Sequence, residues 1–523
     1  MGPKVNGRTL HWFRKGLRLK DNKALLSGLQ TNPESFFPVF ILDKWHSNKK
    51  NVGSIRFRFI LESLQDLDRN LKKQGCSCGL LIFEGEPEEL LPTLWKELKI
   101  STLTFDDSEE NEPHSRQVDE VVKDLAKKEG VEVICTACHY LHSPESYSKL
   151  LNGGPLYPHT YTNLLKLFQK LGNVPAPLSL AENYPFIPKI LDNAKLPPRK
   201  DIANIAEAFP NRFTGQLGES KFPGGEQEAL ERLKTKVKDR KKWVKRFHKP
   251  STSPVALEPA TTVLSPYLTH GCISVREVWH AVQEIEQDRF PCQTSLCGQL
   301  LWRELWYIMG RNTPNYGKMK GNPICKQIPW DNDKALVKAW KTGQTGYPLI
   351  DAFMTQLRQE GWIHHLARHR VACFLTRGDL WQSWEQGAAA FDEMLIDADW
   401  SLNNSNWMWL SCSAFYSQYF KCFSPVSKEL DKDGYYIRKY VKPLAKMPKR
   451  YLLEPWKAPL NVQVAANCII GKDYPEPIVY DHKTTSRENM ARMKQAFAEQ
   501  KKLAPKKRKF TEGKFFTSSK AKK

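Results

Sequence analysis

The chain has 523 residues and a formal net charge of +22. This length is enough for two or three domains with a large core, and no apolar stretch is long enough to cross a bilayer. The segment 501–523 supplies +9 of the charge, which leaves +13 for the rest of the chain. The charge favours a polyanionic partner, most simply nucleic acid, over a merely solvated basic surface.

The N-terminal residues 1–8 are polar and contain no apolar signal core, so secretion is not expected. The twelve cysteines are therefore interpreted as free thiols rather than a disulfide framework. The stretch "CTACH" (135–139) fits the haem-attachment pattern C-x-x-C-H. It directly follows the strand-like run "VEVI", and we interpret it as a chance match.

Residues 1–140 alternate between strand-like and helical patterns. The runs "TLHWF", "FFPVFILD", "GLLIFEG", "STLTFD" and "VEVIC" are short and apolar, and segment 56–75 has apolar residues at helical spacing. This alternation predicts an α/β domain with a doubly wound parallel sheet. The loop after the first run, "RKGLRLKDN", lacks the glycine fingerprint of a dinucleotide site.

The rest of the chain divides by composition. Residues 141–224 are rich in Pro, Gly, Asn and Lys and predict a connector, whereas 225–497 predict a large all-α domain. Residues 498–523 form a basic tail that is too polar to fold alone. Its cluster "PKKRKF" (505–510) is either a nuclear-localisation signal, which would place the protein in the nucleus, or a solubilising end.

Two stretches of the helical region could line a ligand pocket. In "TTVLSPYLTHGCIS" (261–274), Ser265 is predicted to cap a helix that Pro266 begins; such an end suits a phosphate, although an ordinary cap has the same sequence. In "GQLLWRELWY" (298–307), Trp302 and Trp306 share one helix face. Thirteen of the sixteen tryptophans lie within 243–456, which fits either a bulky core or the lining for a flat aromatic ligand.

The stretch "EGWIHHLARHRVA" (360–372) places His365 and His369 on one helix face, while His364 points elsewhere. No Glu follows the first histidine of the pair and no third ligand is evident, so no metal site is expected. Packed core histidines and proton-transfer groups both remain open interpretations.

The stretch "DADWSLNNSNWMWLS" (397–411) contains Asp397, Asp399 and Asn403 among tryptophans. Carboxylates are costly to bury unpaired, and Arg368 is an available partner for Asp397. An Asn amide can bond to the ring nitrogen of a heterocycle. A polar loop between two helices is the alternative interpretation.

Together these stretches resemble the cryptochrome/photolyase flavoprotein family, from "HWFRKGLRLKDNKAL" (11–25) to "GKDYPEPIV" (471–479). "FPGGE" (222–226), "GNPICKQIPWD" (321–331) and "DADWSLNN" (397–404) are among the specific pieces. The resemblance implies an N-terminal α/β domain that can hold an antenna pigment, a deazaflavin or a folate. It also implies a helical domain that holds one non-covalent FAD.

Matching motifs carry the family's roles onto this chain. Arg368 would pair with Asp397 beside the flavin, and Asn403 would face flavin N5. The full FAD set would be Thr261, Thr262, Leu264, Ser265, Gln299, Arg303, Arg368, Asp397, Asp399 and Asn403. The electron-transfer tryptophans would be Trp407, Trp384, Trp330 and Trp381. The DNA lesion would meet Gln299, Trp302, His365, Trp409, Lys421 and Phe423.

Within the family, the histidine pair resembles (6-4) photolyases and the animal cryptochromes close to them. The resemblance implies repair of (6-4) photoproducts in UV-damaged double-stranded DNA by a monomer, with a protonated His365, held by His369, as proton donor. Asn406 and "EPWKAP" (454–459) favour repair, whereas Phe423 and Ser405 depart from the usual Tyr and Gly. The alternatives are a signalling cryptochrome with protein partners and a flavoprotein that only transports electrons.

Overall fold

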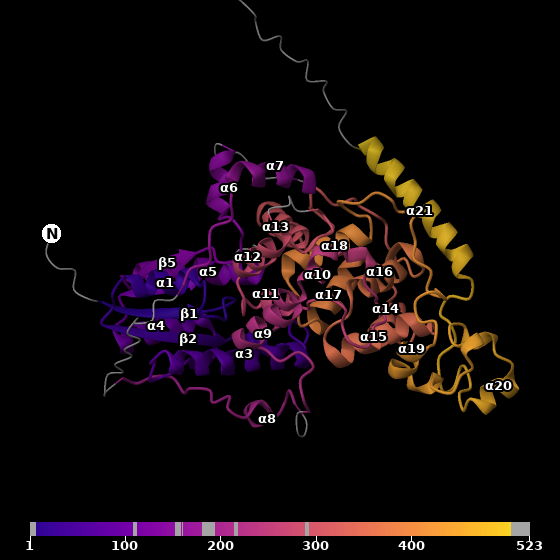
Figure 1. Ribbon diagram of the computed structural model, residues 1–523, viewed down its shortest axis with the longest axis horizontal. Helices are drawn as coiled ribbons and strands as arrows, with labels where there is room; N and C mark the ends of the chain where they lie inside the picture. Colours follow the sequence, from indigo (N-terminus) through magenta and orange to yellow (C-terminus); the bar gives the residue numbers. More distant parts are fainter. Residues whose placement is uncertain are drawn as a thin grey trace, which may run out of the picture.

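The structure is a computed structural model of the chain, and it describes residues 7–107, 112–151, 158, 160–179, 194–213, 218–287 and 292–503. The basic cluster 505–510 and the stretch 108–111 lie outside these residues. Figure 1 shows two parts, a sheet flanked by helices and a larger helical assembly that contains the second half of the chain.

The N-terminal part contains the predicted parallel sheet. Its strands are β1 (Arg8–Phe13), β2 (Ser35–Leu42), β3 (Leu81–Glu84), β4 (Thr102–Asp106) and β5 (Glu132–Thr136), in the order β3-β2-β1-β4-β5. All four strand pairs are parallel. The five strand-like runs of the sequence are therefore confirmed, as is the doubly wound α/β class.

Both faces of the sheet are buried because β2 alternates its side chains between two cores. Phe36 and Phe40 join α1 (Lys23–Gln30) and α3 (Ser54–Lys73) on one face. Phe37 and Val39 join α4 (Pro87–Leu98) and α5 (Pro113–Lys128) on the other. Strands covered by helices on both faces are expected to be apolar throughout, as "SFFPVFIL" is.

The predicted connector carries three helices, and the region after it is helical as expected. The connector helices are α6 (Pro144–Leu150), α7 (Tyr161–Leu171) and α8 (Ile205–Ala208); the short α2 (Lys44–Ser47) follows β2. The C-terminal helices are α9 (Glu226–Lys236), α10 (Lys241–Arg246), α11 (Ser265–Thr269), α12 (Val275–Glu286), α13 (Leu296–Asn312), α14 (Lys334–Thr342), α15 (Pro348–Glu360), α16 (His365–Cys373), α17 (Trp384–Met394), α18 (Trp400–Leu410), α19 (Tyr435–Tyr440), α20 (Leu460–Ala465) and α21 (His482–Leu503). Helix α21 continues past the predicted limit at 497, so the boundary of the tail was placed too early.

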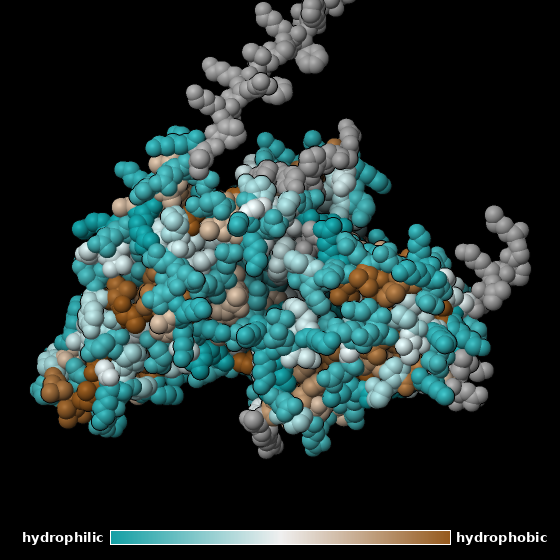
Figure 2. Space-filling model, turned by 180° about the vertical axis from the view of Figure 1, so that it is seen from behind, coloured by the Kyte–Doolittle hydropathy of each residue, from teal (hydrophilic) through white to brown (hydrophobic). Residues whose placement is uncertain are grey.

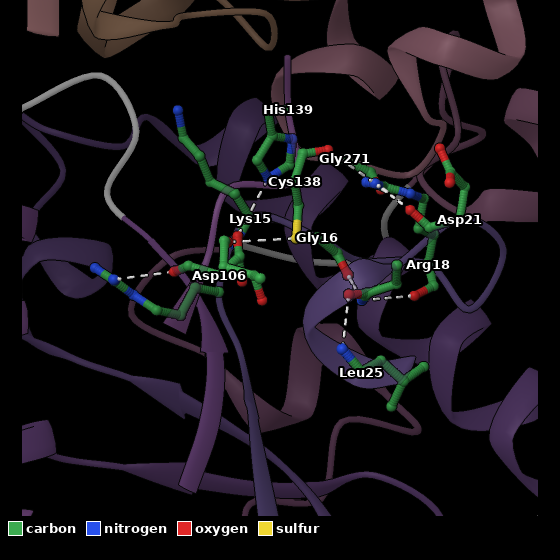
Figure 3. A network of polar contacts seen from close by, with 12 residues as sticks. Lys15, Gly16, Arg18, Asp21, Leu25, Asp106, Cys138, His139 and Gly271 are labelled. Carbon is green, nitrogen blue, oxygen red and sulfur yellow. Dashed lines mark hydrogen bonds and ion pairs between the residues drawn. The ribbon is translucent and has the colours of Figure 1, made fainter. Parts of the chain in front are cut away.

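Buried charged side chains join the two parts. The Glu226 carboxylate, at the start of α9, accepts hydrogen bonds from the backbone N–H groups of Leu19 and Lys20 after β1, both at 2.9 Å. The Arg18 guanidinium reaches back and donates to the backbone carbonyls of Gly271 and Cys138 (Figure 3). Since an unpaired buried charge is costly, these bonds fix how the sheet domain meets the helical domain.

The face of the molecule in Figure 2 is mostly hydrophilic, with hydrophobic side chains in separate patches. Among the described helices, none has the length and apolar content needed to cross a membrane.

All twelve cysteines are free thiols.

Candidate active site

A cavity of about 330 Å³ lies inside the helical region. Its walls come from the loop before α11 and from helices α11, α13, α16, α17 and α18. All ten residues that the family resemblance assigns to FAD line this one cavity: Thr261, Thr262, Leu264, Ser265, Gln299, Arg303, Arg368, Asp397, Asp399 and Asn403. Trp302, His365, His369 and Trp407 line it as well. The fold thus brings together residues that are up to 146 positions apart in the sequence.

The predicted ion pair between Arg368 and Asp397 is present. Arg368 Nη2 lies 2.9 Å from Asp397 Oδ2, and Ser265 Oγ donates to the same oxygen at 2.6 Å. The prediction that the Ser265 hydroxyl caps α11 is wrong, because Leu264 occupies the N-cap position and the hydroxyl serves the carboxylate instead. The other oxygen, Asp397 Oδ1, is buried and has no partner among the described residues.

Asp399 and Asn403 begin and continue α18. Asp399 Oδ1 caps the helix by accepting the Leu402 N–H, and Oδ2 accepts the Tyr307 hydroxyl at 2.5 Å. Burial alone would raise the pKa of Asp399, but Lys15 and Arg303 outweigh it and hold the pKa below its usual value. The carboxylate is therefore ionised at neutral pH.

The Asn403 amide has its two hydrogens already bonded. They reach the Ala388 carbonyl at 2.9 Å and Asp392 Oδ1 at 2.7 Å, so the amide oxygen is the atom left for a ligand in the cavity. Burial raises the pKa of Asp392 to about 7, although Arg56 and Asn403 counteract it. The sequence analysis missed Asp392, because an acidic residue in a helix gives no signal that its carboxylate supports a pocket.

The three histidines His364, His365 and His369, in the first turns of α16, have different surroundings. His364 is the N-cap residue: its Nδ1 accepts the Leu366 N–H, and its Nε2 contacts Thr252 Oγ1 at 2.8 Å. His365 and His369 both face the cavity, with ring centroids 6.2 Å apart. His365 Nε2 is buried and has no partner in the described part of the chain.

In the protein without bound ligands the surroundings of His365 favour its neutral form, and the protonated imidazole held by His369 stays a prediction for the lesion-bound protein. Burial and the nearby Lys249 cation lower the pKa of His365 far below its usual value. Burial and the same lysine lower the pKa of His369 to about 3. Neutral rings cannot supply protons, so protonation of His365 requires a change of charge in the cavity.

The predicted lesion-binding residues divide into two groups. Trp302 and Gln299 line the cavity, and Trp409 packs edge-on against Trp302 with ring centroids 5.4 Å apart. Phe423 lies outside the lining but contacts the His369 ring at 6.0 Å, and Lys421 is exposed. Neither Phe423 nor Lys421 therefore lines the cavity.

Of the four predicted electron-transfer tryptophans, Trp407, Trp384 and Trp381 are buried and Trp330 is partly buried. Trp407 lines the cavity, and its indole fills the space above Gly387 of α17, the helix that begins with Trp384. Trp330 and Trp381 form a second pair with ring centroids 4.8 Å apart. Trp340, which the sequence analysis missed, also contacts Trp407, with a centroid separation of 6.0 Å.

A second, smaller cavity of about 120 Å³ lies where the carboxyl ends of β1, β2 and β4 meet the helical domain. Asp43 accepts from both His46 Nδ1 and His114 Nε2, at 2.6 and 3.2 Å. His114 is the second residue of α5. The antenna pigment that the resemblance implies remains a prediction.

The interpretation of "CTACH" as a chance match agrees with its surroundings. Cys135 lies on β5 with the pKa of its thiol raised by burial to about 12, and His139 pairs with Asp106 at 3.2 Å. Within the described ranges, no group of three or more His, Cys, Asp or Glu side chains could hold a metal ion.

Comparison with known proteins identifies the family. Residues 9–180 match the family model "DNA photolyase", and residues 295–495 match "FAD binding domain of DNA photolyase". A (6-4) DNA photolyase of Arabidopsis thaliana is 44% identical over 517 residues, which cover 95% of this chain and 89% of that protein. The chain belongs to the cryptochrome/photolyase family.

Cryptochromes are nearly as similar. Cryptochrome-1 of Sylvia borin is 43% identical over 500 residues, 93% of this chain and 78% of that protein. Among solved structures, a Synechocystis cryptochrome superposes with a TM-score of 0.78 at 25% identity, over 94% of this chain and all of that one. A class III photolyase of Agrobacterium tumefaciens gives 0.74 at 29% identity, over 96% and 99% of the two chains.

The cofactor of this family domain is FAD, and the cavity suits it. The Asp397 Oδ1 acceptor has no partner among the described residues, while the hydroxyls of Thr261 and Thr262 and the Arg368 guanidinium offer donors for phosphate and heterocycle oxygens. Apolar side chains such as Leu268 and Phe391 complete a lining suited to a flat ring system. The residues present therefore fit the group.

Proposed function

We propose that this protein is a light-driven enzyme that repairs (6-4) photoproducts in UV-damaged double-stranded DNA. The observation that carries the proposal is the position of His365 and His369 in the lining of the FAD cavity. Among the described residues, His365 Nε2 has no hydrogen-bond partner and is available to a ligand. The 44% identity to a protein named (6-4) DNA photolyase supports the same reaction.

The chemistry explains why histidine stands there. In a (6-4) lesion one base has gained a hydroxyl or amine from the other, and its return needs a proton donor. Bound FAD supplies the light-excited electron. The chain's own residues bind the flipped bases, exclude water and deliver the proton. His365 is the proton donor in this proposal, and Trp302 packs against the lesion.

The remaining parts of the proposal concern location and state. The net charge of +22 supports DNA binding, which should weaken steeply as salt increases. The cluster "PKKRKF", outside the described residues, supports a nuclear location. We propose a monomer as the acting form.

A signalling cryptochrome is the second candidate, favoured by the 43% identity to Cryptochrome-1 of Sylvia borin. Phe423 also removes a hydroxyl that repair enzymes of this type usually carry beside the histidines. In that case protein partners, not DNA, would be the ligands.

One experiment separates the two candidates. Purified FAD-loaded protein is illuminated with an oligonucleotide duplex that contains a single (6-4) lesion, and restored thymines are quantified by chromatography. We expect conversion in the light and none in the dark. Absence of conversion in the light, in protein kept fully reduced, would remove the repair proposal, and failure to bind the duplex as well would favour signalling.

A further inference from the structure

Two cysteine sulfurs are in contact in the turn that joins α3 to β3. Cys76 Sγ lies 3.7 Å from Cys78 Sγ, and only Ser77 separates the two residues in the sequence. A disulfide would bring the same two atoms to about 2.05 Å. The two free thiols therefore need only a small approach to form a bond.

The backbone on both sides of the pair is fixed by hydrogen bonds. The Cys76 N–H donates to the Leu71 carbonyl at 3.0 Å, in a pattern that ends a helix with a left-handed residue. Gly75 supplies that residue with a φ of +88°. The Gly79 N–H then donates to the Cys76 carbonyl at 3.1 Å and closes a β-turn. Cys76 and Cys78 are thus the first and third residues of one turn, which keeps their side chains close together.

The two sulfurs differ in their access to solvent. Cys76 is fully buried in the hydrophobic core, whereas Cys78 is half-buried. Both also approach the Gly79 carbonyl oxygen, Cys76 Sγ at 3.7 Å and Cys78 Sγ at 3.2 Å. The hydrogen bond from Cys78 lowers the pKa of Cys76, because it stabilises a thiolate there. A reagent from solvent can reach Cys78, and Cys76 waits behind it.

We propose that Cys76 and Cys78 form a redox-reactive dithiol that closes to a disulfide by exchange with a small-molecule disulfide such as glutathione disulfide. The inference goes beyond the repair proposal and does not depend on it, since neither cysteine lines the FAD cavity. A disulfide between positions 76 and 78 closes a loop of only three residues, and so short a loop adds little stability. The pair therefore suits a reversible redox site better than a structural cross-link.

The exchange has two steps. The Cys78 thiolate attacks one sulfur of glutathione disulfide, the S–S bond of that molecule breaks, and one glutathione thiolate leaves. Cys76 Sγ then attacks Cys78 Sγ, the protein S–S bond forms, and the second glutathione leaves as a thiolate. The two departing thiolates take up the two protons that the cysteines lose. Two cysteine thiols are oxidised, and one glutathione disulfide is reduced to two glutathione thiols.

Peptide mapping by mass spectrometry measures this exchange in the full-length, FAD-loaded protein. The protein is equilibrated with increasing ratios of glutathione disulfide to glutathione, its free thiols are blocked by alkylation, and it is digested with trypsin. The tryptic peptide 74–96 contains both cysteines and no others. We expect an unalkylated form, lighter than the dithiol peptide by two hydrogens, to become the main species as the ratio rises. A peptide that stays a dithiol in excess glutathione disulfide would overturn the inference.

Two serine variants separate the roles of the sulfurs. In Cys76→Ser, the accessible Cys78 should accumulate as a mixed disulfide with glutathione, because the second sulfur is missing. In Cys78→Ser, the buried Cys76 should remain a free thiol. Absence of the mixed disulfide in Cys76→Ser, or equal uptake of glutathione by both variants, would overturn the proposed order of attack.

The same digest contains a matched control. Peptide 129–149 carries Cys135 and Cys138, whose C-x-x-C spacing is typical of redox sites. In this fold, however, Cys138 Sγ donates to the Thr136 carbonyl at 3.4 Å, and burial raises the pKa of Cys135 to about 12. We expect this peptide to stay a dithiol under conditions that oxidise peptide 74–96. Equal oxidation of the two peptides would show that the turn confers no special reactivity and would overturn the inference.

Discussion

The two cavities differ in whether their carboxylates have partners within the protein, although Arg56 Nε is a buried atom without a partner among the described residues in the cavity at the edge of the sheet. In the cavity at the edge of the sheet, Asp43 pairs with two histidines, Asp106 with His139, Asp107 with Arg311, and Glu112 caps α5. In the helical cavity, Asp397 Oδ1 and His365 Nε2 have no partner among the described residues. Unsatisfied buried polar atoms are expensive in an empty protein and become contacts when a ligand binds. The comparison shows that the helical cavity is the one in which a carboxylate oxygen is left as an acceptor for a ligand.

The strands, the last helix and the helix caps show how much of the fold the sequence predicted. Alternating apolar runs predicted five parallel strands, and all five occur at nearly the predicted positions. The end of α21 was misplaced because the basic residues near 501 look like tail but continue a helix to Leu503. The helix caps were the least predictable feature. The Ser265 hydroxyl donates to Asp397, 132 residues away, and does not cap α11.

The largest expected effect is on FAD retention in the helical cavity. Arg368→Leu should release most of the FAD, because it leaves the buried Asp397 carboxylate without its cation, a cost of about 3–5 kcal/mol. The absorbance of the purified protein at flavin and protein wavelengths measures the loss. Arg370→Leu, on the same helix but outside the lining, should retain the cofactor. Equal retention in both variants would mean that the ion pair does not anchor FAD.

The next effect concerns the proton. His365→Asn should reduce repair of a (6-4) duplex by about 10²–10⁴-fold while FAD content stays normal, because a general acid is lost. Repair is measured under constant illumination by product chromatography. His364→Asn is the control, since asparagine can replace its role as N-cap of α16. Normal repair by His365→Asn would exclude this residue as the proton donor.

A smaller effect separates two tryptophans that both contact the same wall. Trp407→Phe should slow photoreduction of oxidised FAD several-fold and leave repair by pre-reduced protein unchanged, because the hopping route starts there. Trp340→Phe changes an indole that touches Trp407 but lies outside the predicted route. Absorbance at the flavin band under blue light measures the rates. If both variants photoreduce like wild type, the route does not pass through Trp407.

The smallest effect is the pH dependence of the free energy of unfolding, compared for two carboxylates: Asp392 in the helical region and Asp43 beside the sheet. Burial raises the pKa of Asp392 to about 7, so its ionisation lowers stability as pH rises from about 4 to 7. The gain in melting temperature of Asp392→Asn over the wild type should therefore be larger at pH 8 than at pH 5.5, by about 1–2 °C. His46 and His114 overcome the burial of Asp43 and lower its pKa, so its contribution is present above about pH 4 and lost below.

Asp43→Asn should accordingly lower the melting temperature at pH 8. Thermal scans of both variants and the wild type at the two pH values measure the effects. Shifts of the same sign in the two variants at pH 8 would show that the two regions do not differ in how they hold their carboxylates.

The sequence by itself determined the α/β and helical classes, because periodicity follows from local backbone geometry. It also determined the family and, through matching motifs, the ten residues of the FAD cavity. The tertiary structure alone decided the states of these groups. Burial and Lys249, which comes from another element, lower the pKa of His365, and Asn403 presents its oxygen because Asp392 and Ala388 bind its hydrogens. Protonation and hydrogen-bond direction depend on neighbours far apart in the chain, and no pattern of residue spacing encodes them.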